Sequence, residues 1–267
     1  MKNNAQKVHG YSYLKLFMIF VVLLTVGFMT YRAVDLYRQR SFLTDSYITL
    51  YTNGEDNFLV SYHSPKSYTV AQLYNTPNLS PSRSSLLQLS LTLGVPIDAV
   101  VIDPELKSPR QIFSLLSTVK MLFFPHSFSL RNMNAFDSFK LFLLARGASD
   151  GQRNDTSLDY SSISEEQLAD LFRDEEIFNN AVSVEIMNGT EIGGLGGEFS
   201  SVLTSRGYNV VAVTNSQTTE NNSYMIVRSR KESQAAKSLS HILRVDKNSD
   251  VGEVADITIV LGRDVAR

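Results

Sequence analysis

The sequence contains no cysteine among its 267 residues. Disulfide bonds, thiolate metal sites, a cysteine nucleophile and a lipidated N-terminal cysteine are therefore all excluded. Histidine is scarce too. The four histidines stand alone, and none has the HExxH or HxxxH spacing of zinc sites. We therefore expect no metal site and no cofactor.

The sequence also lacks an excess of positive charge. The formal net charge is −2, and no long basic run occurs outside the N-terminus. Nucleic-acid binding needs a dense positive surface, so we expect no nucleic-acid partner. Hydrophobic residues make up 43% of the chain and charged residues 19%, so most of it can bury a core. The length suits one large domain or two small ones.

A long apolar segment stands near the N-terminus. Residues 14–31 carry no charge from Leu16 to Met29, and this length is near the lower end of the roughly 17–25 residues that span a bilayer. Interfacial tyrosines flank the segment at positions 11, 13 and 31. We predict a transmembrane helix over 14–31, which makes the membrane a partner.

Two other interpretations of this segment are weaker. A cleaved signal peptide needs a small-x-small site, and "VGFMTYRAVD" offers only a poor one. A buried core helix should have a polar face, which is absent here. Lysines and arginines are balanced across the segment, but the N-terminal side has no acidic residue. We expect residues 1–13 to be a cytoplasmic tail and the domains after residue 40 to be extracytoplasmic.

Four glycines stand close together in "VEIMNGTEIGGLGGEFSSVLTSRGYNVVAV", residues 184–213. A dinucleotide site needs GxGxxG, but Phe199 occupies the third glycine position; a phosphate P-loop needs a lysine that is also missing. The Asn188-Gly189 pair predicts a turn, followed by an amphipathic helix and a left-handed cap at Gly207. The helix tolerates Gly196 and Gly197, which suggests close packing on a sheet.

The elements after this helix continue in the order βαββαβ over residues 181–267. Strands "NVVAV", "YMIVRS" and "DITIVLG" alternate with polar loops, and a second helix buries apolar residues from Ala235 to Leu243. This order predicts a split-βαβ sheet with two helices on one face. With the region before it, the chain is of the α/β (α+β) class.

Residues 181–265 resemble the C-terminal domain of LytR-CpsA-Psr proteins. The family pattern has an NG turn, a glycine-containing helix, "RGY" before a strand and a terminal "VLG.D". The matching residues are Asn188, Gly189, Gly194, Arg206, Gly207, Tyr208, Leu261, Gly262 and Asp264. The resemblance implies a supporting or wall-binding role without catalytic residues. Of these positions, Asn188, Gly189, Arg206 and Asp264 are the candidate binding residues, with mostly structural roles.

The middle region, residues 41–155, predicts a mixed α/β domain. "YITLYTNGEDNFLVSYHSPKSYTVAQL" is typical of three strands joined by turns, and "LGVPIDAVVID" of a turn and a strand. We expect one helix from Pro109 to about Phe123 and a second from Asn134 to Arg146.

The same region resembles a degenerate LytR-CpsA-Psr catalytic domain. "LGVPID" at residues 93–98 matches the family, but "GED" stands for "RSD" and "QLYNT" for "IPRDT". The family's arginines hold a polyprenyl pyrophosphate and its acids bind a divalent metal, because pyrophosphate suits planar cations and Mg²⁺ suits oxygen ligands. The remaining candidates are Asp56, Arg146, Asp150 and Arg153. They are catalytic only if the domain is active.

Residues 148–163 are polar and predict a linker, and residues 156–180 are assigned to a linker with a short helix. A capping box at Ser164 and Gln167 begins the helix "EEQLADLFRDEEIF", whose acids, Asp174 among them, should form one solvated face. The same three arginine and acid candidates near residue 150 could simply be charges of this linker.

The sequence therefore predicts a membrane-anchored, extracytoplasmic protein of the bacterial cell envelope. We expect a non-catalytic protein that binds or organises cell-wall glycan. Its expected partners are peptidoglycan or a wall glycopolymer, and other envelope proteins. The alternative is a phosphotransferase that moves a glycopolymer from polyprenyl pyrophosphate to peptidoglycan, and only then is Mg²⁺ needed. A transcriptional role would follow only from the family's name, and the membrane segment and neutral charge oppose it.

Overall fold

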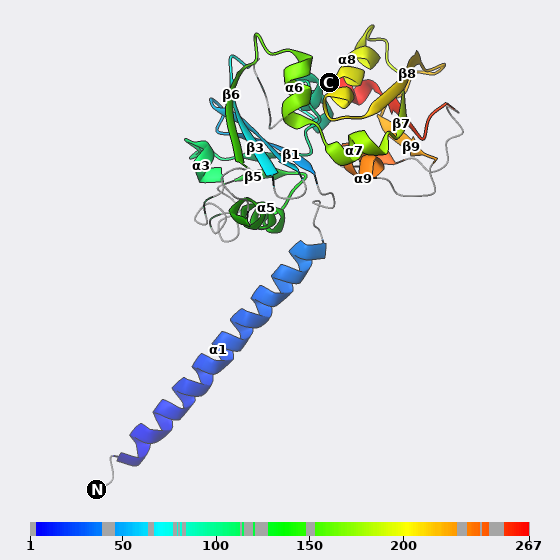
Figure 1. Cartoon of the computed structure of the whole chain (residues 1–267). Coiled ribbons are helices and arrows are strands. Elements are labelled where there is room, and N and C mark those ends of the chain that lie inside the picture. Colours follow the sequence, from blue (N-terminus) through cyan, green and yellow to red (C-terminus); the bar gives the residue numbers. More distant parts are fainter. Residues whose placement is uncertain are drawn as a thin grey trace. The chain divides into compact units, whose positions relative to one another are not determined.

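The structure is a computed structural model that describes residues 4–38, 46–63, 67–76, 79, 81, 84–112, 114, 120, 128–147, 153–228, 234–240, 242–245 and 254–266. The chain divides into two compact units, residues 1–40 and 41–267. The larger unit contains two mixed sheets with helices, so the α/β class is confirmed (Figure 1).

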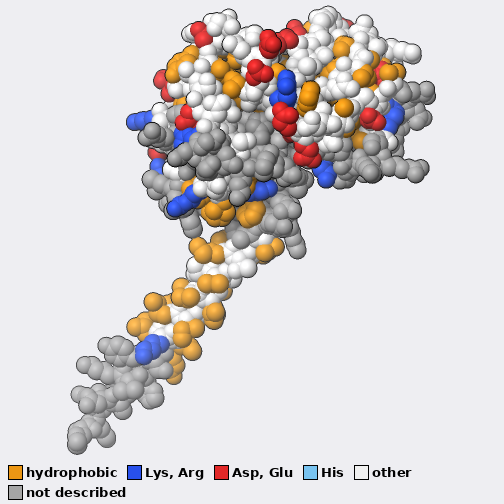
Figure 2. All heavy atoms as spheres, in the orientation of Figure 1, with side chains coloured by type: hydrophobic (Ala, Val, Ile, Leu, Met, Phe, Trp, Pro, Cys, Tyr) orange, Lys and Arg blue, Asp and Glu red, His pale blue; other side chains and the backbone are white. Residues whose placement is uncertain are grey.

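The first unit is a single helix, α1 (Asn4–Arg38). Its segment Tyr13–Tyr31 has a mean hydropathy of 2.1 and is long and apolar enough to cross a membrane. On the side that Figure 2 shows, apolar side chains are spread along this segment, and those of the segment are exposed. The candidate membrane span predicted from the sequence is therefore present as a continuous helix.

The first sheet, sheet A, has the strand order β5-β4-β1-β2-β3-β6. Its centre is the antiparallel meander predicted from the sequence: β1 (Tyr47–Thr52), β2 (Asn57–His63) and β3 (Ser67–Tyr74). On one side β4 (Ala99–Ile102) runs parallel to β1, and β5 (Ser129–Arg131) pairs antiparallel with β4.

Helices cover both faces of sheet A. On one face, α5 (Ala135–Gly147) packs Leu141 and Ala145 against the tyrosine-rich side of β1, β2 and β3. On the other face, α2 (Leu86–Leu93) and α6 (Glu165–Phe172) pack against Leu50 and Leu59. Two apolar clusters thus sandwich the sheet, as expected when the strands alternate side chains between faces.

The two helices predicted in the middle region differ in outcome. The prediction of a helix ending near Arg146 is confirmed by α5, which Asn134 caps by accepting hydrogen bonds from the N–H groups of Phe136 and Asp137. The helix predicted from Pro109 to Phe123 begins at Pro109, but it ends early. Helix α3 spans Pro109–Ile112, and Ser114 is not helical. Most of its remaining residues lie outside the described part of the chain.

The prediction of a linker over 148–163 is wrong for its second half. Residues Arg153–Asp159 form β6, which pairs in parallel with β3 over its full length and closes sheet A. The residues of β6 are polar because β6 is an edge strand with exposed side chains, and this polar composition is what suggested a loop. Residues 148–152 lie outside the described residues, and Asp150 with them.

The acidic helix after the linker is two helices. The Ser164–Gln167 capping box is confirmed for α6, but a break at Arg173 starts α7 (Glu175–Asn180). Asp174 is not on a solvated face: it is buried and caps α7 by accepting hydrogen bonds from the N–H groups of Glu176 and Ile177. Since α6 packs on sheet A and Ile177 of α7 joins the core of the second sheet, this pair of helices links the two sheets.

The second sheet, sheet B, has the order β10-β9-β11-β7-β8. Its strands are β7 (Ser183–Asn188), β8 (Asn209–Asn215), β9 (Tyr224–Val227), β10 (Arg244–Val245) and β11 (Ile257–Leu261). The predicted βαββαβ order holds, with the short β10 added. The prediction of a split unit is wrong: β7 and β8 are immediate parallel neighbours, so no strand lies between them.

Helices α8 (Leu195–Ser205) and α9 (Gln234–Leu239) contribute to one apolar cluster with β7, β9 and β11, so both cover the same face as predicted. The close packing inferred from two glycines belongs to one of them. A Cβ on Gly196 would lie 2.8 Å from a methyl of Val213, whereas a Cβ on Gly197 meets nothing within 4 Å. Gly207 ends α8 with a φ of +99°, as its position predicts.

Candidate functional site

The parallel strands β11, β7 and β8 all end at the same edge of sheet B, because β11 and β8 both run parallel to β7. In α/β sheets, ligands bind beyond the carboxyl ends of parallel strands, where loops diverge. The residues after β7 and β11 and the loop 216–223 after β8 meet here. This edge is the candidate site.

Asn188 and Gly189 fasten the loop that leaves β7. The Asn188 side chain accepts hydrogen bonds from the N–H and hydroxyl of Thr190 and donates one to the Ile192 carbonyl. A Cβ on Gly189 would lie 2.8 Å from the Leu261 carbonyl oxygen, so only glycine fits between the ends of β7 and β11. Both predicted positions therefore shape backbone.

Asp264 has the same kind of role at the end of β11. It lies in the 3₁₀ turn η3 (Arg263–Ala266), and its Oδ1 accepts hydrogen bonds from the N–H of Ser223 at 2.9 Å and from the Ser223 hydroxyl at 2.7 Å. The Ser223 hydroxyl oxygen in turn accepts from the N–H of Gly262. This chain ties the loop 216–223 to the end of the central strand, and Ser223 is a partner that the sequence motif did not reveal.

Several other polar side chains at this edge are exposed or half-exposed. Two backbone hydrogen bonds hold the loops that carry them: the Glu220 N–H donates to the Gly189 carbonyl, and the Arg263 N–H donates to the Glu220 carbonyl. We define the carboxyl rim as the exposed or half-exposed residues Glu191, Thr218, Glu220, Asn221 and Arg263. The rim offers carboxylates, an amide, a hydroxyl and one guanidinium.

One ion pair crosses the carboxyl rim. Arg263 Nη2 lies 2.6 Å from Glu191 Oε1, and both side chains are about half exposed or more. The pair joins the loop after β7 to the turn after β11. Within the described residues, no group of three His, Asp or Glu side chains is placed to hold a metal ion, at this rim or elsewhere.

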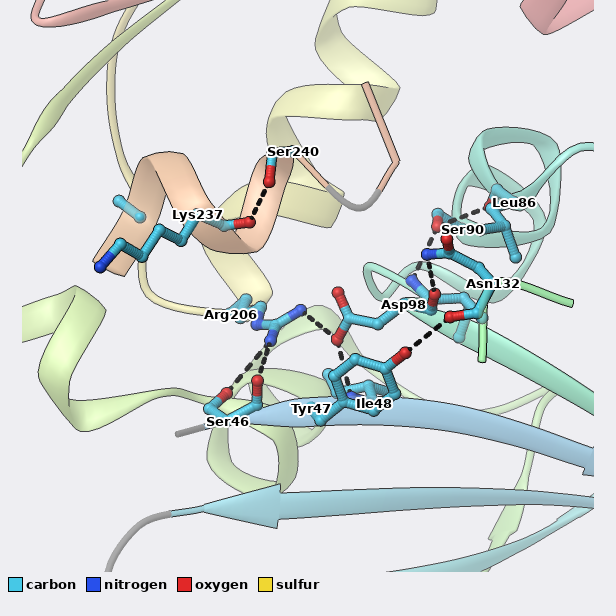
Figure 3. A network of polar contacts seen from close by, with 12 residues as sticks. Ser46, Tyr47, Ile48, Leu86, Ser90, Asp98, Asn132, Arg206, Lys237 and Ser240 are labelled. Atoms are coloured by element: carbon cyan, nitrogen blue, oxygen red, sulfur yellow. Dashed lines mark hydrogen bonds and ion pairs between the residues drawn. The ribbon is translucent and has the colours of Figure 1, made fainter. Parts of the chain in front are cut away.

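Arg206, the fourth predicted binding position, lies elsewhere and is buried (Figure 3). Its Nη1 donates to Asp98 Oδ2 at 2.8 Å, and both side chains are only 1% exposed. Its Nη2 donates to the carbonyl and hydroxyl of Ser46 at 3.1 Å each. Arg206, which follows α8, therefore bonds to residues that directly precede β1 and β4 of sheet A.

Asp98 is the centre of this contact. Its Oδ2 also accepts from the N–H of Ile48 at 2.7 Å, so one carboxylate oxygen joins β1 to Arg206. Burial works against the charged guanidinium, but the negative groups around it, Asp98 first, outweigh burial and raise the pKa of Arg206. The "LGVPID" and "RGY" motifs thus meet in space, a pairing that neither motif indicates by itself.

Asp56 and Arg153, two of the predicted catalytic residues, lie far apart. Asp56 lies in the β1–β2 turn, where it accepts a hydrogen bond from the Asn53 amide. Arg153 begins β6 opposite Tyr68, while the strand that follows Asp56 begins opposite Leu73. Five residues of β3 separate these register positions, about 17 Å along a strand.

Arg153 is paired within its own strand. Arg153 forms two contacts with Asp155, at 2.8 and 2.5 Å, and stacks over Tyr68, so its charge is matched locally. Arg146 is exposed in the last turn of α5. Asp150 lies outside the described residues. The structure does bring Asp56's neighbour Asn57 to Thr76, whose side chains hydrogen-bond at 3.0 Å, so two segments with family-like residues are adjacent.

A family model described as "LytR cell envelope-related transcriptional attenuator" matches residues 181–264. The match covers sheet B with its helices and ends in η3. No curated protein and no solved structure matches the chain. The degenerate catalytic domain assigned to residues 41–155 stays a prediction, since the match does not extend to it. The C-terminal domain is thus of the cell-envelope-related LytR type, as its motifs predicted.

Proposed function

We propose that this chain is a non-catalytic, membrane-anchored protein that binds cell-wall glycan through the carboxyl rim of its C-terminal domain. The observation that carries the proposal is the position of the rim. Side chains with carboxylate, amide, hydroxyl and guanidinium groups stand beyond the parallel strands of a domain from an envelope-related family. Such groups supply the donors and acceptors that hydroxyl-rich glycans need.

The rigid base of the rim supports this assignment. The motif residues Asn188, Gly189 and Asp264 hold the loops in place and use their polar atoms locally. We therefore assign these three residues a structural role and not a role in glycan binding. The residues of the carboxyl rim are the ones exposed to solvent. A site whose loops are already fixed loses less entropy on binding.

A second element of the proposal is the topology. The apolar segment of α1 anchors the chain in the membrane, with residues 1–13 in the cytoplasm and residues 41–267 in the envelope beyond it. Peptidoglycan and wall glycopolymers are the partners within reach there, and other envelope proteins could be organised by the same surface.

The phosphotransferase alternative has less support. A pyrophosphate site needs arginines and acids converging on one cleft. Asp56 and Arg153 lie near opposite ends of β3, the strand between β2 and β6, and Arg153 is paired with Asp155. Mg²⁺-dependent binding of polyprenyl pyrophosphate to the full chain is the direct measurement for this alternative, and we expect none.

The glycan proposal is tested by sedimentation of the detergent-solubilised full chain with insoluble peptidoglycan. We expect co-sedimentation, and we expect the double variant Glu191→Ala/Arg263→Ala to lose at least several-fold of it. The matched control is Glu105→Ala/Lys120→Ala, which removes another exposed ion pair of the same 2.6 Å length, outside the C-terminal domain. Equal binding by both double variants, or no binding by the unmodified chain, would contradict the proposal.

A further inference from the structure

Helix α5 has apolar side chains on both of its sides. The side that faces sheet A buries Leu141 and Ala145. The opposite side carries Phe136 and Phe139, which are half-buried, and Leu143, which is 51% exposed. These three residues are spaced by three and four positions, so they form one stripe along the helix. A helix that is apolar all round is normally covered on every side, but Leu143 is open to solvent.

Basic residues accompany the apolar stripe, and this side of the helix has no acidic residue. Lys140 and Arg146 each lie three residues from Leu143 and therefore on its side of α5. The acidic residue of α5, Asp137, is fully buried and accepts a hydrogen bond from the Asn134 N–H. In Figure 2, hydrophobic side chains lie beside basic ones in the region where Figure 1 shows α5. We define the α5 outer face as Phe136, Phe139, Lys140, Leu143 and Arg146.

The two helix-covered faces of sheet A differ in charge. The helix α6 packs on the face opposite to α5, and its exposed residues include Glu165, Glu166 and Asp170. The α5 outer face carries two cations instead. An anionic surface therefore attracts the α5 side of sheet A and repels the α6 side.

The helix α5 begins near the point where the chain from the membrane segment enters sheet A. Tyr47 is the first residue of β1, and its hydroxyl donates a hydrogen bond at 3.0 Å to the Asn132 carbonyl, just before the Asn134 cap of α5. Tyr47 also shares an apolar cluster with Leu141 and Ala145 of α5. The α5 side of sheet A thus lies close to the attachment of the anchor.

The length of chain between the apolar segment and β1 keeps the larger unit near the bilayer. Helix α1 continues over residues 32–38 beyond the apolar segment, and residues 39–45 join it to Ser46. Seven helical residues rise about 10 Å, and the joining residues reach at most about 30 Å when fully extended. Ser46 is therefore held within about 40 Å of the membrane surface.

We propose that the α5 outer face is a membrane-contact site, which lies on the surface of the bilayer that α1 crosses and binds anionic lipid headgroups. The inference rests on the membrane anchoring proposed above. The apolar stripe enters the boundary between headgroups and acyl chains, while Lys140 and Arg146 bind lipid phosphates. The contact turns the acidic helix α6 away from the bilayer.

The size of the α5 outer face favours lipid over a protein partner. Three apolar side chains and two cations are far fewer than the roughly 20–30 residues that each side of a stable protein interface contributes. A lipid surface needs no such area here, because the anchor keeps it at high effective concentration. Lipid also satisfies both halves of the face, since it offers acyl chains and phosphates side by side.

Depth-dependent fluorescence quenching tests the contact in the full chain, because the sequence has no cysteine and one introduced thiol carries one label. Leu143→Cys is labelled with an environment-sensitive fluorophore in proteoliposomes of phosphatidylglycerol and phosphatidylcholine. We expect a lipid that is spin-labelled near its headgroup to quench the label about two-fold or more, and aqueous iodide to quench it little. The matched control is Val211→Cys on β8, another apolar residue of similar exposure, where we expect the reverse.

A charge reversal tests the role of the cations. In the labelled Leu143→Cys protein, Arg146→Glu should remove about half or more of the lipid quenching, and added salt or a lower fraction of phosphatidylglycerol should act in the same direction. The matched control is Lys237→Glu, because Lys237 is also an exposed cation in the last turn of a helix. We expect this control to leave the quenching unchanged.

Two further measurements separate this inference from the proposed function. A label at Leu23→Cys, within the apolar segment of α1, reports membrane insertion, and peptidoglycan sedimentation of the Leu143→Cys protein reports glycan binding. Quenching by lipid at Leu23 and Leu143 but not at Val211 supports the contact. A Leu143 label that iodide reaches, or that is shielded from iodide and lipid alike, overturns it; in the second case protein covers the face. An unquenched Leu23 label contradicts the anchoring itself and this inference with it.

Discussion

Sheet A and sheet B both contain residues that the sequence singled out, and the structure uses the two sets differently. In sheet B, Asn188, Gly189 and Asp264 converge on one edge and each closes a contact with a neighbouring loop. In sheet A, Asp56 and Arg153 lie near opposite ends of β3, the strand between them. The family model matches the first region and not the second.

The difference shows which kinds of residue a sequence pattern can identify. At Gly189, a carbonyl oxygen would lie 2.8 Å from any added Cβ, so this backbone arrangement requires glycine. A catalytic set is required only while its chemistry is kept, and its members must meet from distant segments. The following predictions test how far sheet B depends on such ties and how little sheet A depends on its exposed charges.

The largest effect should come from Arg206→Met. The substitution leaves Asp98 buried and without its cation, which typically costs about 3–5 kcal/mol of unfolding free energy. Denaturant unfolding of the solubilised full chain measures it. In contrast, Arg153→Met removes a half-exposed pair and should cost less than about 1 kcal/mol.

A double variant sharpens this result. Asp98→Asn removes the buried charge but can still accept the hydrogen bond from the Ile48 N–H. Arg206→Met/Asp98→Asn should therefore be more stable than Arg206→Met alone. If the double variant is the less stable, the unpaired charge is not the source of the loss, and the hydrogen bonds of Arg206 to Ser46 are the better explanation.

Gly262→Ala should have the next largest effect. A Cβ at Gly262 would lie 2.4 Å from a backbone carbon of Asn222, so the loop 216–223 must move, and we expect a loss of about 1–3 kcal/mol, the usual cost of overpacking. Gly197→Ala is the matched control. Its Cβ meets nothing within 4 Å in the first turn of α8, so it should stabilise the chain by up to about 1 kcal/mol.

Much of the fold could be predicted from the sequence because its signals are local. The Ser164 capping box, the left-handed cap at Gly207 and the alternating strands β1, β2 and β3 each depend on neighbouring residues. The edge strand β6 could not be predicted, since its polar composition is typical of a loop. Its partner β3 supplies the pairing from about 85 residues away.

The candidate site was predicted only in part, for a related reason. The family-like motifs indicated Asn188, Gly189, Arg206 and Asp264, but not what each contacts. Arg206 has the same motif status as Asp264, yet it bonds to Asp98 across 108 residues of sequence. Whether a motif residue stays within its domain or joins another depends on how the two sheets pack, and no local pattern carries that information.

A loss of similar size is expected for Ser223→Ala. The variant removes a hydroxyl that donates to Asp264 Oδ1 and accepts from the Gly262 N–H. The first of these hydrogen bonds is partly buried and the second is buried. Two lost hydrogen bonds of this kind should cost about 1–3 kcal/mol together, and glycan sedimentation should fall with the loosened loop. Unchanged exchange of the Gly262 amide with solvent would show that this tie does not hold the rim.

The smallest effect concerns a carboxylate at the other end of sheet B. Hydrogen bonds from the Ser183 hydroxyl and N–H lower the pKa of Asp256, which is largely exposed. Ser183→Ala keeps only the N–H donor, so the pKa of Asp256 should rise toward the ordinary value of about 3.9. Carboxyl NMR titration of the two proteins checks this shift.

The sign of the stability change follows from the direction of that shift. A carboxyl whose pKa is lower in the folded chain stabilises the fold above the unfolded pKa, and it loses this contribution as the pH falls through the folded pKa. The natural chain should therefore exceed Ser183→Ala in stability above about pH 4 and approach it at lower pH. A difference that instead grew on acidification would mean that Ser183 acts through the Asp256 N–H bond it accepts, which does not titrate.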